Sequence, residues 1–218
     1  MASTLFTVGA VVAVTLLALL VLTIRVPSVR VWPTPGPGSW QGYLFWPLFR
    51  GLNVLCFAVA IADRSPLLAL TGNARAFSFA LLAVSIGLFV AAFRVLGRGN
   101  SYGAQDGLVT RGIYGWSRNP QNAMLIVVYA CLAMAADSAF AYVLCAATMA
   151  VYALMVLAEE PWLEAAYGDA YHRYCRRVPR FVNWRRAAVL ARAIGWRVAR
   201  NFAAAQAGRG SAISRPGR

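Results

Sequence analysis

Three groups of polar residues interrupt an otherwise apolar chain and are the candidates for chemistry. They are Arg-Asn-Pro at 118–120, Glu-Glu at 159–160 and the segment 167–180, YGDAYHRYCRRVPR. A carboxylate at the edge of a membrane is partly desolvated, so it needs a cationic partner. Glu159 and Glu160 therefore predict a site for a cation, and Arg118 predicts a site for an anion. The alternative for the glutamates is structural, because they could end one apolar helix and cap the next.

The Asn-Pro pair also indicates the start of a helix, with Asn119 as the N-cap and Pro120 as the first helical residue. The free backbone N–H groups at such a start bind carboxylates or phosphates. A helix start and a ligand site are therefore compatible interpretations of this segment. His172 is the only histidine of the chain. It is a further candidate for a catalytic base, and the alternative is a surface residue between aromatic and basic neighbours.

The cysteines indicate packing rather than chemistry. Three of the four lie in apolar runs and none forms a C-x-x-C pair; they are Cys56, Cys131, Cys145 and Cys175. Buried cysteines behave as small apolar residues. We therefore expect no disulfide and no zinc site.

The composition indicates which elements must position the polar groups. The chain has 218 residues, of which 60% are hydrophobic and 13% are charged, whereas soluble domains have roughly 25% charged residues. These values exclude a disordered chain, a coiled coil and an ordinary soluble enzyme. They predict an all-α polytopic membrane protein with one domain and a tail.

Five apolar runs predict about five transmembrane helices. The runs cover residues 4–24, 44–62, 76–93, 122–136 and 139–158. Only the short polar break at 137–138 separates the last two runs, so these two helices must form a hairpin. A hairpin brings its open ends together, and helices in contact have axes about 8–10 Å apart. Arg118, Asn119 and the glutamate pair are therefore expected to reach one pocket.

The arginines give the orientation of this topology. All basic residues are arginines, and twelve of the 21 lie in 173–218. The loops 25–43 and 94–121 also contain arginines, whereas the opposite side has only Arg64 and Arg75. Because arginine-rich segments stay in the cytoplasm, we expect the N-terminus outside and the C-terminus in the cytoplasm. The expected location is the inner membrane of a bacterium.

A cytoplasmic helix is predicted to follow the last span. Pro161 suits the first position of a new helix, which would end near Arg177, before a second proline. This helix would present Tyr167, Tyr171 and Tyr174 on one face.

The basic C-terminal segment indicates contact with lipids. Residues 185–206 predict an amphipathic helix that lies on the membrane surface and binds anionic lipid headgroups. Residues 207–218 are expected to be disordered. Nucleic acid is not expected as a partner, because a chain held in a bilayer has little access to it.

Taken in order, these motifs resemble those of a known family. R-N-P at 118–120, a helical hairpin, E-E-P-W at 159–162 and the segment 167–180 are similar to the membrane-integral S-adenosylmethionine-dependent methyltransferases. That group contains the isoprenylcysteine carboxyl methyltransferases and the phospholipid N-methyltransferases. The resemblance divides the chain into N-terminal helices (1–75), a methyltransferase-like core (76–182) and a basic tail (183–218).

The resemblance implies S-adenosylmethionine as the cofactor, at the cytoplasmic end of the last three spans. It implies a catalytic role for Arg118 and Glu160. The cofactor-binding residues that it implies are Tyr114, Asn119, Pro120, Glu159, Glu160, Tyr167, Tyr171, Arg177 and Arg180. The chain departs from the family pattern at Asn122, where tyrosine is usual, and at Met124, where glycine is usual.

The implied methyl acceptor is a lipidic or small molecule that presents either an isoprenylcysteine-type carboxylate or a phospholipid amine. A lipid would enter sideways from the bilayer, and the cofactor would enter from the cytoplasm. Two alternatives are a non-catalytic lipid-binding membrane protein of the same fold and a sterol-reductase-like enzyme that uses NADPH.

Overall fold

Every regular element in the described part of the chain is a helix. The computed structural model describes residues 1–36, 38–102, 107–182, 188–189, 192 and 196. Four helices are long and apolar enough to cross a membrane: α1 (Ala2–Arg25), α2 (Trp40–Ala62), α3 (Gly72–Leu96) and α6 (Ala139–Arg177). The all-α class is thereby confirmed for these residues.

The fifth apolar helix, α5 (Pro120–Ala136), is shorter, with 17 residues. At about 1.5 Å per residue it is roughly 25 Å long, against a hydrocarbon layer of about 30 Å. Five complete crossings and a cytoplasmic C-terminus therefore stay predictions. Short helices occupy the connections, namely η1 (Pro27–Val29), α4 (Arg98–Ser101) and η2 (Gly112–Gly115).

Hydroxyl side chains determine where three of the long helices begin. Ser39 Oγ accepts a hydrogen bond from Gly42 N (3.2 Å) at the start of α2, and Thr71 Oγ1 accepts one from Ala74 N (3.3 Å) at the start of α3. Ser138 caps α6 in the same way. These N-caps satisfy backbone donors that have no partner inside the helix. As a result, α2 and α3 begin before the apolar runs predicted at 44 and 76.

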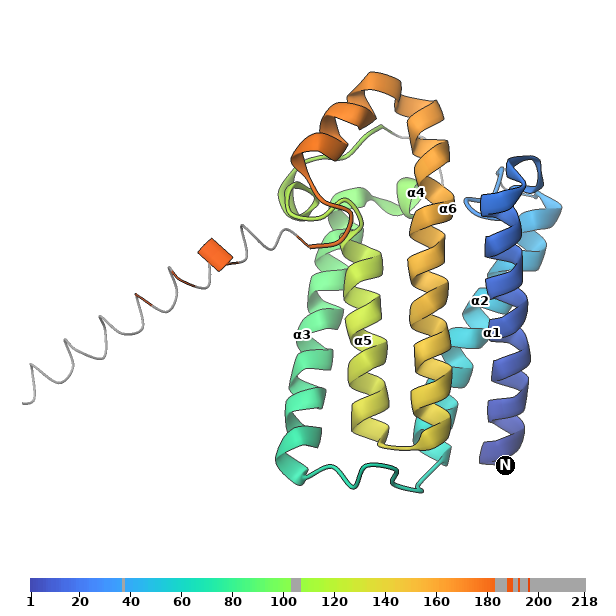
Figure 1. Cartoon of the computed structure of the whole chain (residues 1–218), viewed down its shortest axis with the longest axis vertical. Helices are drawn as coiled ribbons and strands as arrows, with labels where there is room; N and C mark the ends of the chain where they lie inside the picture. The colour runs from blue at the N-terminus through green and yellow to red at the C-terminus, as the bar shows by residue number, and fades with distance from the viewer. Residues whose placement is uncertain (37, 103–106, 183–187, 190–191, 193–195, 197–218) are drawn as a thin grey trace, which may run out of the picture. The chain divides into compact units, whose positions relative to one another are not determined.

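The helices α1, α2, α5 and α6 share the larger of two apolar clusters, which forms the core. α3 packs on α5, α5 packs on α6, and α6 packs on α1, which also contacts α2 (Figure 1). Fully buried side chains from four of these helices form the core, including Leu16, Phe45, Tyr129 and Val151. Helices in a bilayer associate through van der Waals packing rather than through transfer of side chains from water. Close packing in this core therefore holds the hairpin against the N-terminal helices.

The turn between α5 and α6 is held by a buried carboxylate. Asp137 has a left-handed backbone (φ 53°) and no exposed surface. Its carboxylate accepts hydrogen bonds from Leu68 N (3.0 Å) and Leu70 N (2.9 Å), and it lies 3.7 Å from Arg75 Nη2. Burial opposes ionisation, but these partners outweigh it and hold the pKa of Asp137 below its ordinary value. The connection between α2 and α3 is thereby fixed to the hairpin turn.

The last helix differs from its prediction. The sequence predicted an apolar span to residue 158 and a new helix from Pro161, whereas α6 runs without interruption through Pro161. The proline removes one intrahelical hydrogen bond but does not end the helix. The break occurs instead at Gly168 (φ 47°, ψ −127°), a conformation that costs a glycine little. Past the level at which α5 begins, α6 bends and returns over the last turns of α3 and the first turns of α5 (Figure 1).

The chain divides into two units, Met1–Phe181 and Val182–Arg218. All the helices above belong to the first unit. The amphipathic helix predicted at 185–206 and the disorder predicted at 207–218 lie almost entirely outside the described residues. The subdivision into 1–75 and 76–182 stays a prediction.

Candidate functional site

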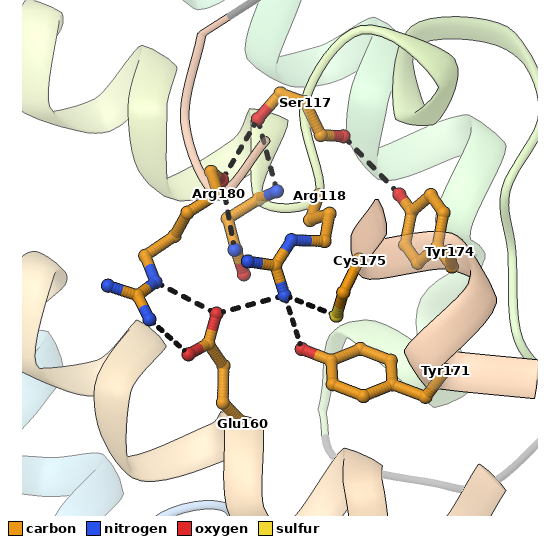
Figure 2. A network of polar contacts seen from close by, with 8 residues as sticks. Ser117, Arg118, Glu160, Tyr171, Tyr174, Cys175 and Arg180 are labelled. Atoms are coloured by element: carbon orange, nitrogen blue, oxygen red, sulfur yellow. Dashed lines mark hydrogen bonds and ion pairs between the residues drawn. The ribbon is translucent and has the colours of Figure 1, made fainter. Parts of the chain in front are cut away.

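An ion pair joins the open ends of the α5–α6 hairpin. Arg118 Nη1 lies 3.2 Å from Glu160 Oε1, as Figure 2 shows. Arg180, in the segment after α6, donates to the same carboxylate from Nε (2.9 Å to Oε1) and from Nη2 (2.6 Å to Oε2). The fold therefore brings the Arg-Asn-Pro turn and the glutamate pair together, as expected from the hairpin.

Arg180 is the second cationic partner of Glu160 and interacts strongly with its carboxylate. Its hydrogen bonds to Glu160 raise the pKa of the Arg180 guanidinium above its ordinary value, and burial opposes this only in part. Fork-shaped pairs of this kind are the geometrically most specific contacts between arginine and carboxylate. Glu160 is thus occupied by two cations, and its side chain is only 18% exposed.

Arg118 has a further set of partners on the returning part of α6. Its Nη1 lies 3.1 Å from the Tyr171 hydroxyl and 2.7 Å from Cys175 Sγ, and the guanidinium carbon lies 5.8 Å from the centre of the Tyr171 ring. Its Nε is buried and has no hydrogen-bond partner among the described residues. A buried donor without a partner is costly, so this atom is suited to an acceptor on a ligand.

The backbone after α6 holds the turn that carries Arg118. Pro179 O accepts from Arg118 N (3.0 Å), and Arg180 O accepts from Asn119 Nδ2 (3.1 Å). Tyr174 donates its hydroxyl proton to Tyr114 O (2.7 Å) on the other side of the turn. The Val-Pro-Arg end of the sequence motif therefore acts by positioning the turn (Figure 2).

A cavity of about 470 Å³ opens beside this network. That is within the range of about 300–1,000 Å³ found for small-molecule sites. Its wall includes Glu159 but not Glu160, so the two adjacent glutamates have different surroundings. The other predicted site residues in the wall are Tyr114, Arg118, Asn119, Tyr167 and Tyr171.

Tyr114 is fixed in the wall by a glutamine that was not predicted. Gln121 Nε2 donates to the Tyr114 hydroxyl (3.1 Å) and to Ser101 Oγ (3.0 Å). Burial raises the pKa of Tyr114 well above its ordinary value. The phenol therefore stays protonated at physiological pH and serves as a hydrogen-bonding group.

Several candidate residues lie outside the cavity wall. Pro120 is buried as the first residue of α5, and Arg177 is exposed at the end of α6. His172 is exposed and its Nε2 lies 3.1 Å from Glu164 Oε1. Of the two departures from the family pattern, Asn122 lines the cavity, whereas Met124 does not.

A polar cluster deeper in the bundle was missed from the sequence. Asn53 Oδ1 accepts hydrogen bonds from the hydroxyls of Tyr129 and Tyr152, the latter at 2.7 Å, and its Nδ2 donates to Phe49 O (2.6 Å). All three polar residues line the cavity. The signal was an amide inside the apolar run 44–62, because an amide in a membrane needs partners.

The cysteines and acids give no sign of a metal centre. All four cysteines are free thiols. Among the residues that the structure describes, no three histidine, cysteine or acidic side chains lie close enough together to hold a metal ion.

Comparison with known protein families finds a match for part of the chain. Residues 73–170 match the family model described as phospholipid methyltransferase. This segment contains Arg118 and both glutamates, whereas Tyr171 and Arg180 lie beyond it. The match confirms the resemblance to the membrane-integral methyltransferases and supports a membrane methyltransferase in general. Comparisons with curated proteins and with solved structures find no match.

Proposed function

Because residues 73–170 carry the sequence pattern of the phospholipid methyltransferase family, we propose that the chain transfers a methyl group from S-adenosylmethionine to a lipidic or small acceptor. The acceptor group is a carboxylate of the isoprenylcysteine type or a phospholipid amine. The reaction takes place at the cytoplasmic face of a bacterial inner membrane.

The observation that carries this proposal is the presence of both charges, a carboxylate and a guanidinium, in the wall of one cavity. Glu159 presents a carboxylate to the cavity, and Arg118 presents a guanidinium with an unpartnered Nε. The methionine part of the cofactor has an ammonium and a carboxylate, so the two residues are complementary to its two charges. The free N–H groups at the start of α5, where no side chain caps the helix, add to the anion site.

The cofactor supplies a methyl group on a sulfonium centre, which makes it a strong methyl donor. The chain contributes positioning and electrostatics rather than covalent chemistry. Glu160 acts through Arg118 and Arg180, because it pairs with both and is absent from the cavity wall. It is therefore a positioning residue, whereas the sequence motifs implied that it contacts the cofactor directly.

The nature of the acceptor decides whether a base is needed. A carboxylate acceptor is already an anion and attacks without losing a proton. An amine acceptor must lose a proton, so it requires a base besides Glu159, whose carboxylate faces the ammonium of the cofactor. A lipid reaches the cavity from the bilayer between the helices, and the cofactor reaches it from the cytoplasm.

The test is cofactor binding by the full-length protein in detergent. S-Adenosylmethionine is expected to raise the Tm of the wild-type protein, since a ligand that binds only the folded state stabilises it. The variants Glu159→Gln and Arg118→Ala should weaken binding roughly tenfold or more, which corresponds to about 1.4 kcal/mol. Glu164→Gln is the matched control, because Glu164 is exposed and pairs with His172 outside the cavity wall.

The same measurement separates the alternatives. Stabilisation by NADPH but not by S-adenosylmethionine would favour the reductase-like enzyme. Stabilisation by neither cofactor would favour the non-catalytic lipid-binding protein. Unchanged affinity for S-adenosylmethionine in both cavity variants would remove the proposed site.

A further inference from the structure

A second, open groove of about 1240 Å³ contains an unusual concentration of positive charge. Three arginines line it, namely Arg30 before α2, Arg50 within α2 and Arg98 at the start of α4. Among the residues that the structure describes, the wall of this groove includes no acid. Arg30 and Arg50 also lie outside the segment that matches the family, so the match does not account for them.

The position of Arg50 is unfavourable for a charged side chain. It is an exposed residue within α2, which is long and apolar enough to span a membrane. Its guanidinium carbon lies 5.4 Å from the centre of the Trp46 ring, one turn nearer to the start of the helix. A guanidinium within an apolar span is costly unless an anion or water meets it. Within the described part of the chain, none of the three arginines forms an ion pair with a carboxylate.

The groove adjoins the cavity that holds the proposed cofactor site. Trp46, Tyr102 and Trp162 belong to the walls of both. The rings of Trp46 and Tyr102 are in contact, with centroids 5.0 Å apart. An aromatic partition therefore separates an arginine-lined groove from the cavity that contains Glu159.

The surroundings of the groove favour a lipid over a soluble anion. Its wall includes Tyr43, which is 73% exposed. Trp40, at the first position of α2, is 59% exposed. Exposed tyrosine and tryptophan at the end of a membrane helix are typical of the headgroup layer. Arg50 lies in a helix that is long and apolar enough to span a membrane. A long arginine side chain in such a helix extends toward the interface, where the phosphates of the lipids lie.

We propose that the groove binds the phosphate of a membrane lipid through Arg30, Arg50 and Arg98. Guanidinium groups bind phosphate oxygens through paired, charge-assisted hydrogen bonds. On the proposed methyltransferase function, the same lipid is the acceptor, and the part of its headgroup beyond the phosphate passes the aromatic partition toward Glu159. Phosphate recognition itself depends only on the groove and stands independently of that function.

The test measures lipid retention by the intact, full-length protein using native mass spectrometry. The probes are dioleoyl phosphatidylglycerol, which has a phosphate, and dioleoylglycerol, which has the same chains without it. The wild-type protein is expected to retain phosphatidylglycerol at least tenfold more tightly. Arg50→Gln, Arg98→Gln and Arg30→Gln should each reduce that preference several-fold, and the combined variant should abolish it.

The control variant is Arg94→Gln, which removes the same charge from an exposed arginine in the last turn of α3. Arg94 lies in neither cavity wall, so it should leave the preference unchanged. The Tm of each variant and its stabilisation by S-adenosylmethionine are measured alongside. A groove variant that keeps cofactor binding but loses the lipid preference supports the proposal without reference to catalysis.

Two results would overturn it. One is equal retention of the two lipids by the wild-type protein, or a preference that persists in the combined variant. The other is displacement of phosphatidylglycerol by millimolar inorganic phosphate, because the ligand would then be a soluble anion. Should the combined variant fold poorly, the single variants and the competition with inorganic phosphate still decide the question. Absence of cofactor binding in every form would contradict the methyltransferase function and leave the lipid site standing.

Discussion

Arg118 and Glu160 meet across the open end of the α5–α6 hairpin, with Nη1 and Oε1 3.2 Å apart. Their side chains are 12% and 18% exposed, so the pair is largely shielded from water. Each residue has other partners on the segment that returns after Gly168: Tyr171 and Cys175 for Arg118, and Arg180 for Glu160. This one contact therefore connects the start of α5, the middle of α6 and the chain beyond it.

The first prediction concerns the coupling of this pair. Arg118→Ala and Glu160→Gln should each weaken cofactor binding, and the double variant should lose less than the two single losses combined. Side chains in one network commonly show coupling of about 0.5–3 kcal/mol. A double-mutant cycle of cofactor Kd, measured by calorimetry, gives the value. Strict additivity would mean that Glu160 does not act through Arg118.

The second prediction concerns the Asn53 cluster. Tyr129→Phe and Tyr152→Phe each remove one hydroxyl donor to Asn53, and each should cost about 1 kcal/mol of stability. Asn53→Leu should cost more than either, because it leaves two phenols without their acceptor. Thermal unfolding in detergent measures these effects. Tyr43→Phe, at an exposed tyrosine, should have no effect on stability, and an equal loss there would contradict the interpretation.

The third prediction is a dependence of stability on pH that arises at Asp137. The folded protein holds the pKa of this carboxyl below its ordinary value, which is about 3.9. Its contribution is therefore complete above about pH 4 and is lost as the pH falls through the lower value in the folded state. Asp137→Asn should lower the Tm at neutral pH and reduce the further loss on acidification. Cofactor affinity at pH 7 should not change, because this turn joins the ends of α5 and α6 that lie away from the cavity.

The fourth prediction concerns two glycines with open space around them. A Cβ at Gly168 or at Gly87 would meet no neighbouring atom, so only backbone conformation distinguishes the two sites. Gly168→Ala should destabilise the protein by about 1–3 kcal/mol because of its positive φ. Gly87→Ala, within α3, should stabilise it by about 0.5–1 kcal/mol. Comparison of the two Tm values tests this, and a stabilising Gly168→Ala would contradict the observed kink.

Much of the site geometry follows from the spacing of the apolar runs. The hairpin and the meeting of Arg118 with Glu160 could be predicted, since a two-residue break between apolar helices allows only one arrangement. The different surroundings of Glu159 and Glu160 could not, because adjacent helical residues differ by about 100° around the axis and the sequence does not specify which of them faces the cavity. The continuation of α6 through Pro161 was missed because the proline was interpreted as the start of a new helix, whereas it only removes one hydrogen bond from the helix that contains it.

Residues of α2 line both the cavity and the groove, although every sequence motif of the candidate site lies later in the chain. Asn53 and Arg50 lie in α2, well before the methyltransferase-like segment in sequence. The hydrogen bonds of Asn53 to Tyr129 and Tyr152 form only when α2 packs against α5 and α6. Patterns within one segment do not report such contacts. The motifs of the family resemblance lie within residues 76–182 and therefore do not include Asn53 or Arg50.

The kink at Gly168 has a consequence for biosynthesis. Pro179 and Arg180 supply the carbonyl oxygens that hold the Arg118 turn, and both come after every membrane helix in the order of translation. A nascent chain can thus insert all its apolar segments while the ligand-binding end is still open. The Arg118 turn gains these contacts only when the segment after α6 emerges from the ribosome, so a chain that ends before Pro179 would reach the bilayer with this turn unsupported.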